Sequence, residues 1–455
     1  MNVKYLAFIL WVIATAVQAS ESVLDKYVNE ALENSLALHQ QQFSLEKSLA
    51  ALKEARGLFF PSIGINARYT RAGGGREIEF PVGDLFNPIY STLNQLIQQQ
   101  VFPENLRNEV IPFLREKEQE TKISAVQPIF EPQILYNYKI KSTLVEIEQN
   151  NKRIYIRQVV SEVKSAYLKY LLTIQINKLL LETRQLLDEN LRVSQKLFEN
   201  NKVTKEVVYR AEAELSELDQ QIAQAEKSKE LAKSYFNFLL NRSLDEEIIV
   251  SEEDLPIQKE EADLPAALQL ATQKREELKI LQLAVKASDQ GIKLNQSAYL
   301  PSVFAALDYG YQGEEYRFTS SDDFWMASAV LRWNLFNGFQ DQARVQQAKI
   351  DKKRQQVKYA ELENQIKLQV QEIFNNVVVS RKSIKSAEDR LISARKSFEI
   401  IDRKYREGIL PYIVYLDARS NLTRSEINSI ITRYEYYISL VELERVLAAY
   451  PITQN

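Results

Sequence analysis

Four short segments of the chain alternate apolar with polar residues, which is the period of a β-strand with two unlike faces. They cover residues 62–70, 122–130, 303–312 and 325–335. On one face the last segment carries Trp325, Ala327, Ala329, Leu331, Trp333 and Leu335. An apolar face opposite a small and polar one suits a transmembrane barrel, with lipid outside and water inside. A soluble sheet that packs one face on helices would give the same alternation.

The spacing of two tryptophans gives the length of the predicted apolar face along the last strand. Trp325 and Trp333 are on the same predicted face, and at about 3.3 Å per residue they would stand roughly 26 Å apart. That separation is close to the height of the band between the aromatic girdles of a membrane barrel. We therefore expect Trp325 and Trp333 to belong to the aromatic girdle.

Two much longer segments, residues 133–200 and 340–407, contain neither glycine nor proline. Apolar residues recur in them at spacings of three and four, and Lys, Glu and Gln fill the other faces. This pattern is typical of packed helical arrays. As continuous helices, these segments would each reach roughly 100 Å at 1.5 Å per residue.

Each long helix is predicted to end at a tight reversal. Asn201 and Gly408 stand there, and these are the residue types that favour a left-handed helix cap. The chain then returns as a second helix, over about residues 204–241 and 411–449.

The predicted elements occur twice in the same order: helix, strand pair, very long helix, tight turn, long helix. The sequence PSIGINARYT at residues 61–70 is answered by PSVFAALDYG at residues 301–310. Four strands mounted on long helices cannot close a sheet on themselves, so the chain is predicted to be part of a larger assembly. We divide it into a signal peptide (1–19), a first repeat (20–242), an acidic and exposed equatorial connector (243–264), a second repeat (265–450) and a tail (451–455).

The signal peptide is predicted from its three usual parts. Lys4 supplies the positive charge, residues 5–16 the apolar core, and residues 17–19 a small-residue cleavage site. A retained membrane anchor is the alternative, but the apolar core is short for one.

The first repeat holds a large insertion between its two strands, at about residues 73–120. It begins with three glycines, and four prolines divide it into short pieces that we expect to be helical. Long barrel loops lie on the extracellular side, so the insertion is expected there. It could cap the pore or merely decorate the barrel.

Composition excludes several classes of function. The chain has no cysteine, one histidine (His39) and a net charge of −3. A disulfide framework, a thiol nucleophile and a lipidated cysteine are therefore excluded, and nothing favours a nucleic-acid partner. No phosphate-binding glycine loop or metal-ligand cluster is present in the sequence, so we expect neither an enzyme nor a cofactor.

From about Val23 to Tyr450, the chain resembles the TolC-like outer-membrane efflux proteins (outer membrane factors). The resemblance rests on the doubled plan, the two Pro-Ser strand openings and the turn at residues 405–408 leading to Leu416-Asp417-Ala418. It implies a mainly α chain with a membrane β-barrel. Three chains of four strands would form a 12-stranded barrel continued by a periplasmic α-helical barrel.

The resemblance also implies a function. Such a trimer is a channel-tunnel in the outer membrane of a Gram-negative bacterium, embedded in outer-membrane lipid. It serves as the passive exit duct of a tripartite efflux or secretion system. Its partners would be a periplasmic adaptor protein and an inner-membrane pump, and it would be gated at its periplasmic helix tips.

Family members carry gate residues around the last helical turn. Asp417 matches an acidic position facing the narrow entrance, Tyr405 matches the gate tyrosine, and Gly408 lies in the turn between them. The helix macrodipole alone also favours an acid such as Asp417 near the start of a helix.

Other gate positions depart from the family. The second acidic position holds Val414 and the arginine position holds Leu410. In the first repeat, Val207 stands where some members carry an aspartate, with Glu206 beside it. The resemblance therefore implies an altered gate network.

The helix tips are basic, and the family meets its adaptor at these tips. The candidate docking residues are Lys202, Lys205, Arg403, Lys404 and Arg406. Solvated helix ends carry the same residue types, because basic side chains favour the last turn of a helix.

A periplasmic adaptor or a coiled-coil structural protein is the main alternative function, since long helical hairpins suit both. Neither has a use for four alternating strands. The cargo and the class of pump cannot be read from a wide, water-filled duct.

Overall fold

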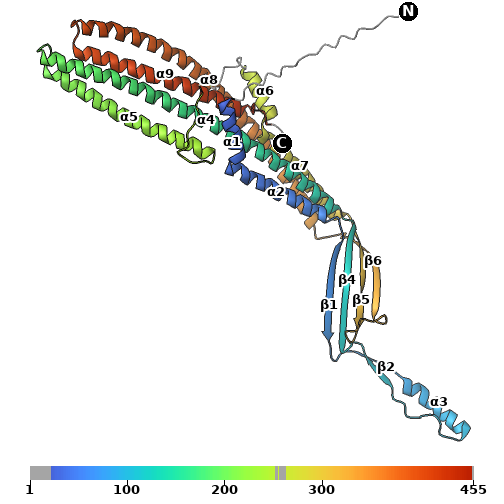
Figure 1. Ribbon diagram of the computed structural model, residues 1–455. Coiled ribbons are helices and arrows are strands. Elements are labelled where there is room, and N and C mark those ends of the chain that lie inside the picture. The colour runs from blue at the N-terminus through green and yellow to red at the C-terminus, as the bar shows by residue number, and fades with distance from the viewer. Residues whose placement is uncertain (1–21, 252–254, 256–262, 453–455) are drawn as a thin grey trace, which may run out of the picture. The chain divides into compact units, whose positions relative to one another are not determined.

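The computed structural model describes residues 22–251, 255 and 263–452 (Figure 1). The predicted signal peptide, residues 1–19, lies outside this part of the chain. Two compact units make up the described chain. The helical unit comprises residues 22–49, 143–286 and 352–452 with the gaps given above, and the sheet unit comprises residues 50–142 and 287–351.

Long helices dominate the chain. They are α1 (Val23–Asn34), α2 (Leu36–Gly57), α4 (Pro132–Glu199), α5 (Lys205–Leu239), α6 (Leu264–Lys274), α7 (Glu276–Gln296), α8 (Gln340–Arg406) and α9 (Tyr412–Val446). The two longest, α4 with 68 residues and α8 with 67, begin and end within one residue of the predicted positions. Among the described residues, no helix is both long and apolar enough to cross a membrane.

Both predicted reversals have the same hydrogen-bond pattern. Asn201 and Gly408 adopt left-handed backbone conformations, with φ of 55° and 74°. The next residue donates its N–H five positions back, Lys202 to the Leu197 carbonyl at 2.8 Å and Ile409 to the Lys404 carbonyl at 2.9 Å. This is the Schellman arrangement, which satisfies carbonyls that would otherwise be left free at a helix end.

The core of the helical unit gathers around three aromatic residues from three helices. Tyr167 and Phe236 are fully buried, and the Phe236 ring lies 5.1 Å from that of Tyr27, edge to face. Apolar burial of this kind is the main stabilising contribution in such a helical array.

The start of the predicted connector is exposed, as expected, except at Ile248 and Ser251. Residues 243–251, 255, 263 and 264 of it are described, and Ile248 is buried. The Asn237 amide donates to the carbonyls of Leu244 and Glu246, at 3.1 and 2.8 Å. The Ile249 N–H donates to the Tyr27 hydroxyl at 2.8 Å. These bonds hold residues 243–251 on the helices, which the acidic and proline-marked composition did not reveal.

The sheet unit contains the four predicted strands. They are β1 (Ser62–Arg71), β4 (Lys117–Phe130), β5 (Ser302–Gly313) and β6 (Asp323–Arg332), joined antiparallel in the order β1-β4-β5-β6. They lie side by side in Figure 1. Within the described chain, β1 and β6 each have one edge without a partner strand. An open sheet edge leaves N–H and C=O groups that another strand can pair with.

The register gives the sheet one apolar face. Ile65, Ile123, Tyr309 and Trp325 stand opposite one another in a row across all four strands. Ile65 and Trp325 are each 74% exposed. An apolar row that protein does not cover is what the predicted lipid-facing surface requires.

The other face carries charges that neutralise one another across three strands. Glu120 pairs with Arg68 on β1 at 3.2 Å and with Lys122 on its own strand at 3.1 Å. Lys122 also reaches Asp308 on β5, at 3.1 Å. Gly310 stands opposite Lys122, and a Cβ there would lie 2.4 Å from the Thr121 carbonyl oxygen, so the close approach of β4 and β5 requires glycine.

The last strand is shorter than predicted. β6 ends at Arg332, so Trp333 and Leu335 lie beyond the strand. Arg332 is paired with Ser302, and the residue before Ser302 is Pro301, which has no N–H to extend the ladder. The Trp333 indole instead donates at 3.1 Å to the carbonyl of Tyr299, the last residue of the 3₁₀ turn η2 (Ser297–Tyr299). The strand therefore covers all but the last step between the two tryptophans, both are exposed, and their place in an aromatic girdle stays a prediction.

The structure of the insertion also differs from the prediction. It consists of β2 (Glu77–Phe80), α3 (Val82–Ile97) and β3 (Glu109–Pro112), and β2 pairs with β3. It thus contains one helix and a two-stranded ribbon rather than several helical pieces, and Pro88 lies inside α3 instead of ending it. Because β4 already begins at Lys117, the insertion is a few residues shorter than predicted.

Candidate functional site

Three tyrosines stack beside the second reversal. Tyr405 comes from the last turn of α8, and Tyr412 and Tyr415 from the first turn of α9. The ring centre of Tyr405 lies 4.8 Å from that of Tyr415 and 5.7 Å from that of Tyr412. Phe398, two turns earlier on α8, lies 5.6 Å from Tyr415. We call Phe398, Tyr405, Tyr412 and Tyr415 the tip cluster.

The tip cluster also contacts the first hairpin. Ala211 of α5 is buried with it, and Leu191 of α4 and Val207 of α5 pack against it. The cluster therefore joins four helices, α4, α5, α8 and α9, near their turns. On α9 the buried positions Tyr412, Tyr415 and Arg419 recur at three and four residues, the spacing of one helix face.

The cluster is apolar and uncharged in character. Burial raises the pKa of each of its three tyrosine hydroxyls above the ordinary value near 10. All three are therefore neutral at physiological pH. The Tyr412 hydroxyl is buried without a hydrogen-bond partner, while that of Tyr415 bonds the Asn190 side chain.

A buried arginine closes one side of the tip cluster. The guanidinium carbon of Arg419 lies 5.4 Å from the Phe398 ring centre, and its Nη2 donates to the Thr183 hydroxyl at 3.1 Å. Its Nε has no partner, and in the described part of the chain Arg419 forms no ion pair. A buried cation without a carboxylate is costly, which suggests a function other than stability.

The acidic site residues predicted from the sequence lie elsewhere. Asp417 is exposed on the face of α9 that also presents Ile413 and Asn421, and it forms no ion pair among the described residues. Glu206 is exposed at the start of α5 and pairs with Arg210 at 2.7 Å. Within one chain, neither acid joins Tyr405 in the tip cluster.

The predicted docking residues are all exposed at the two turns. Lys202, Arg403 and Lys404 have no ion pair in the described chain. Lys205 lies 5.2 Å from the Tyr209 ring centre, and Arg406 pairs with Asp402 at 3.0 Å. Three of the five are thus free to meet a partner.

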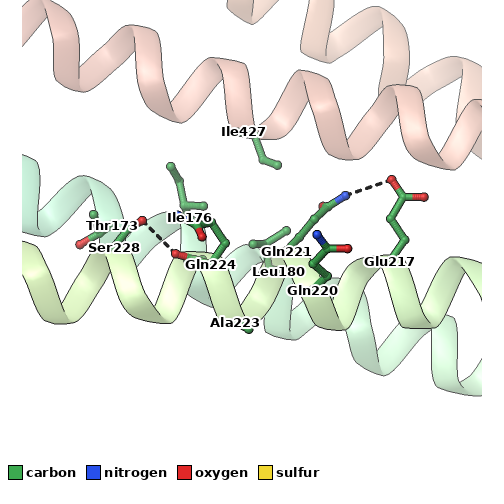
Figure 2. A pocket seen from close by; sticks show the side chains of 11 residues that line it. Thr173, Ile176, Leu180, Glu217, Gln220, Gln221, Ala223, Gln224, Ser228 and Ile427 are labelled. Atoms are coloured by element: carbon green, nitrogen blue, oxygen red, sulfur yellow. Dashed lines mark hydrogen bonds between the residues drawn. The ribbon is translucent and has the colours of Figure 1, made fainter.

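Farther along the same helices runs a groove of about 710 Å³ (Figure 2). Ile176 and Leu180 of α4 form its apolar base, Gln220, Gln221 and Gln224 of α5 line one wall, and Ile427 of α9 faces them. The groove adjoins a smaller hollow of about 250 Å³ that Arg419 and Glu214 line. Burial, and then the neighbouring Glu217, raises the pKa of Glu214. No group of His, Cys, Asp or Glu among the described residues could hold a metal ion.

Sequence reasoning found Tyr405 but missed Phe398, Tyr412, Tyr415 and Arg419. The spacing of Tyr412, Tyr415 and Arg419 can be read from the sequence and marks the buried face of α9. What that face contacts was not available, because Thr183 lies 236 positions from Arg419.

Known proteins resemble both the sequence and the fold. Residues 267–449 match the family model of outer membrane efflux proteins. Over 192 residues the chain is 22% identical to the probable efflux pump outer membrane protein TtgC and to the antibiotic efflux pump outer membrane protein ArpC, both of Pseudomonas putida. Each match covers 41% of this chain and spans 39% of the relative.

Solved structures match over nearly the whole chain. The structure of CusC has a TM-score of 0.78 at 15% identity, covering 94% of this chain and 92% of CusC. That of the outer membrane protein VceC of Vibrio cholerae has a TM-score of 0.75 at 14% identity, covering 93% and 95%. At these identities the structures show a shared fold.

Proposed function

We propose that this chain is a TolC-like outer-membrane efflux protein and that it forms a passive exit duct, because residues 267–449 match the model of that family and its fold is that of solved outer-membrane channels. The duct belongs to a tripartite efflux or secretion system in the outer membrane of a Gram-negative bacterium. Three copies would close one barrel of strands and one barrel of helices. The names of the relatives, which are efflux pump outer membrane proteins, support this function.

One observation carries the proposal: the sheet has an uncovered apolar face, and both of its edges lack a partner strand in the described chain. Membrane barrels have at least eight strands, so four must be completed by other copies. β4 ends at Phe130 and α4 begins at Pro132, so a strand passes almost directly into a helix of 68 residues. A duct that crosses a membrane and continues into the periplasm needs this connection.

The gate is proposed at the two reversals. The tip cluster would hold the hairpin α8–α9 against α4 and α5 in the closed state, with Tyr405 in that contact and Gly408 allowing the turn. Asp417 and Glu206 lie outside the cluster on exposed faces, where copies around a three-fold axis could place them at the entrance. This gate depends on aromatic contact, since Val414 and Leu410 replace charged residues of the family.

Adaptor docking is proposed at the basic tips. Lys202, Arg403 and Lys404 are exposed and unpaired in the described chain, as an acidic adaptor surface would require. Reversing the charges of Arg403 and Lys404 together should impair export without changing trimer insertion. Normal export by that variant would argue against docking at this turn.

The native mass of the protein, solubilised in detergent from the outer-membrane fraction, tests the function. A trimer is expected, because only closure with other copies satisfies both sheet edges. A soluble periplasmic monomer or dimer would overturn the proposal.

A further inference from the structure

The insertion between β1 and β4 has its polar side chains inside. Asn94 on α3 is 5% exposed, donates to the Phe102 carbonyl at 2.8 Å, and accepts from the N–H groups of Val101 and Phe102. Asn87 binds Leu106 in the same way, at 2.8 Å in both directions. One face of α3 is therefore fixed to the insertion's own return segment by asparagine side chains.

The opposite face of α3 is apolar and uncovered. Leu85, Ile89 and Leu96 are 60%, 51% and 75% exposed. At 3.6 residues per turn they lie on one stripe, on the side of the helix away from Asn87 and Asn94. We call Leu85, Ile89, Thr92 and Leu96 the outer stripe. An exposed apolar surface of this kind marks an interaction site.

The spacing of the outer stripe indicates what covers it. Its members are separated by four, three and four positions, which is the core spacing of a coiled coil. A helix with this seam fits other helices of the same kind, and copies of α3 are the nearest such helices that a homo-oligomer offers.

The charged residues of the insertion argue against a lipid surface as the partner of the outer stripe. Asp84 is the one charged residue in α3, so helices packing side by side would bury few charges. Residues 72–116 hold six acidic and three basic side chains. An acidic segment is repelled by anionic lipid headgroups, whereas peripheral lipid binding normally uses lysine and arginine.

The position of the insertion brings copies together. It leaves the sheet from β1, an edge strand, and the Ala72 N–H donates to the Glu116 carbonyl at 3.0 Å, extending the β1–β4 ladder to the base of the insertion. If neighbouring copies close the sheet at this edge, three insertions surround one axis at the same end of the barrel.

We infer that the outer stripes of α3 from three copies pack against one another and form a cap over the extracellular end of the channel. This inference rests on the proposed trimeric duct. The occupant of the apolar stripe is thus a second and third copy of the same chain.

Crosslinking in intact cells tests the cap. The chain has no cysteine, so Leu96→Cys introduces a single thiol. Under mild oxidation two of the three thiols at the axis can join, so the expected product on a denaturing gel is a disulfide-linked dimer. The matched control is Gln95→Cys, which is exposed on the same helix but off the outer stripe and should stay mainly monomeric.

The native mass and thiol reactivity of Leu96→Cys, measured in the same cells, separate the outcomes. A trimer whose Leu96→Cys thiol stays reduced and reacts with a membrane-impermeant maleimide overturns the cap but leaves the duct. A trimer whose thiol neither crosslinks nor reacts assigns the stripe to lipid and also overturns the cap. Equal dimer yields from both variants would show random collision and overturn it too, and the absence of a trimer would overturn both proposals.

Discussion

At the level of single residues, the tip cluster contains a polar group without a partner. The Tyr412 hydroxyl is buried and makes no hydrogen bond, whereas the Tyr415 hydroxyl bonds Asn190. A buried hydroxyl that lost its water and gained nothing destabilises the state that buries it. The packing of the cluster therefore carries an energetic cost at Tyr412.

Tyr412→Phe should stabilise the protein. Removing the unpaired hydroxyl while keeping the ring should raise the free energy of unfolding by about 1 kcal/mol, and the fraction of time that single channels are open should fall. Denaturant unfolding and channel recordings measure the two effects. Tyr415→Phe is the control and should lose stability by a similar amount, because it leaves Asn190 without its partner. The opposite order of the two variants would contradict this account of the cluster.

Asp417→Asn tests whether the exposed Asp417 carboxylate lines the channel entrance. If copies of Asp417 line the entrance, their removal should reduce the preference of the channel for cations over anions, because a ring of carboxylates concentrates cations. Single-channel reversal potentials in a salt gradient report this preference. Glu206→Gln tests the first repeat in the same way. Unchanged selectivity in Asp417→Asn would remove this residue from the entrance.

Resemblance and residue type located Tyr405 and Asp417, but they did not distinguish the two environments. Tyr405 is packed among aromatic rings and Asp417 is in solvent, although both lie near one turn. The burial of Arg419 could not be predicted from the sequence. Whether an arginine is buried or exposed depends on which distant segments of the chain pack beside it.

At the level of elements, the meeting of β4 and β5 depends on one missing side chain. A Cβ at Gly310 would lie 2.4 Å from the Thr121 carbonyl oxygen and 2.6 Å from the Lys122 Cβ. These contacts are too short, so the backbone of β4 or β5 would have to move to accommodate a side chain. Lys122 must pass here to reach Asp308. The charged row across three strands therefore requires glycine at this position.

Gly310→Ala should weaken the β4–β5 pairing. We expect a loss of about 1–3 kcal/mol of stability and a smaller yield of native trimer, as overpacking usually causes. Heat resistance of the trimer band on gels measures the effect. Gly64→Ala on β1 is the matched control, since a Cβ there meets no atom within 4 Å and should be tolerated. Equal tolerance of both variants would show that the strands can separate without cost.

Periodicity predicted elements better than it predicted their ends. All four strands and both long helices were located, because their faces differ sharply along the sequence. The alternation continues through Trp333 and Leu335, yet the strand stops at Arg332 because Pro301 cannot extend the opposite strand. Proline was likewise a poor guide in the insertion, where Pro88 is tolerated within α3.

At the level of the whole molecule, one arginine joins the two repeats. Arg157 on α4 donates from Nε and Nη2 to the Glu276 carboxylate at 3.0 and 2.8 Å, and from Nη1 to the Tyr450 carbonyl at 2.6 Å. The two charged side chains are 14% and 8% exposed. A single side chain therefore connects the first repeat with the start of α7 and with Tyr450, which follows α9.

Arg157→Met should cost about 3 kcal/mol of unfolding free energy, because it leaves the Glu276 carboxylate buried without a counter-charge. Adding Glu276→Gln should recover much of the loss. Lys286→Met, which breaks an exposed pair with Glu146, is the control and should cost at most about 1 kcal/mol. Denaturant unfolding compares the four proteins. If the double variant were no better than Arg157→Met, the loss would come from packing and not from the unpaired charge.

The need for other copies could be predicted from the sequence, since four strands cannot close a barrel. The long-range contacts that arrange one copy could not be predicted. Arg157 and Glu276 are 119 positions apart, and nothing in either local sequence points to the other.

The two open edges of the sheet have a consequence for genetics. A chain that folds normally but has β6 blocked still offers β1, so it can enter a ring and prevent its closure. In a cell that makes equal amounts of intact and blocked chains, about one three-chain ring in eight contains only intact chains. Alleles that block an edge should therefore be dominant, whereas alleles that prevent folding should be recessive.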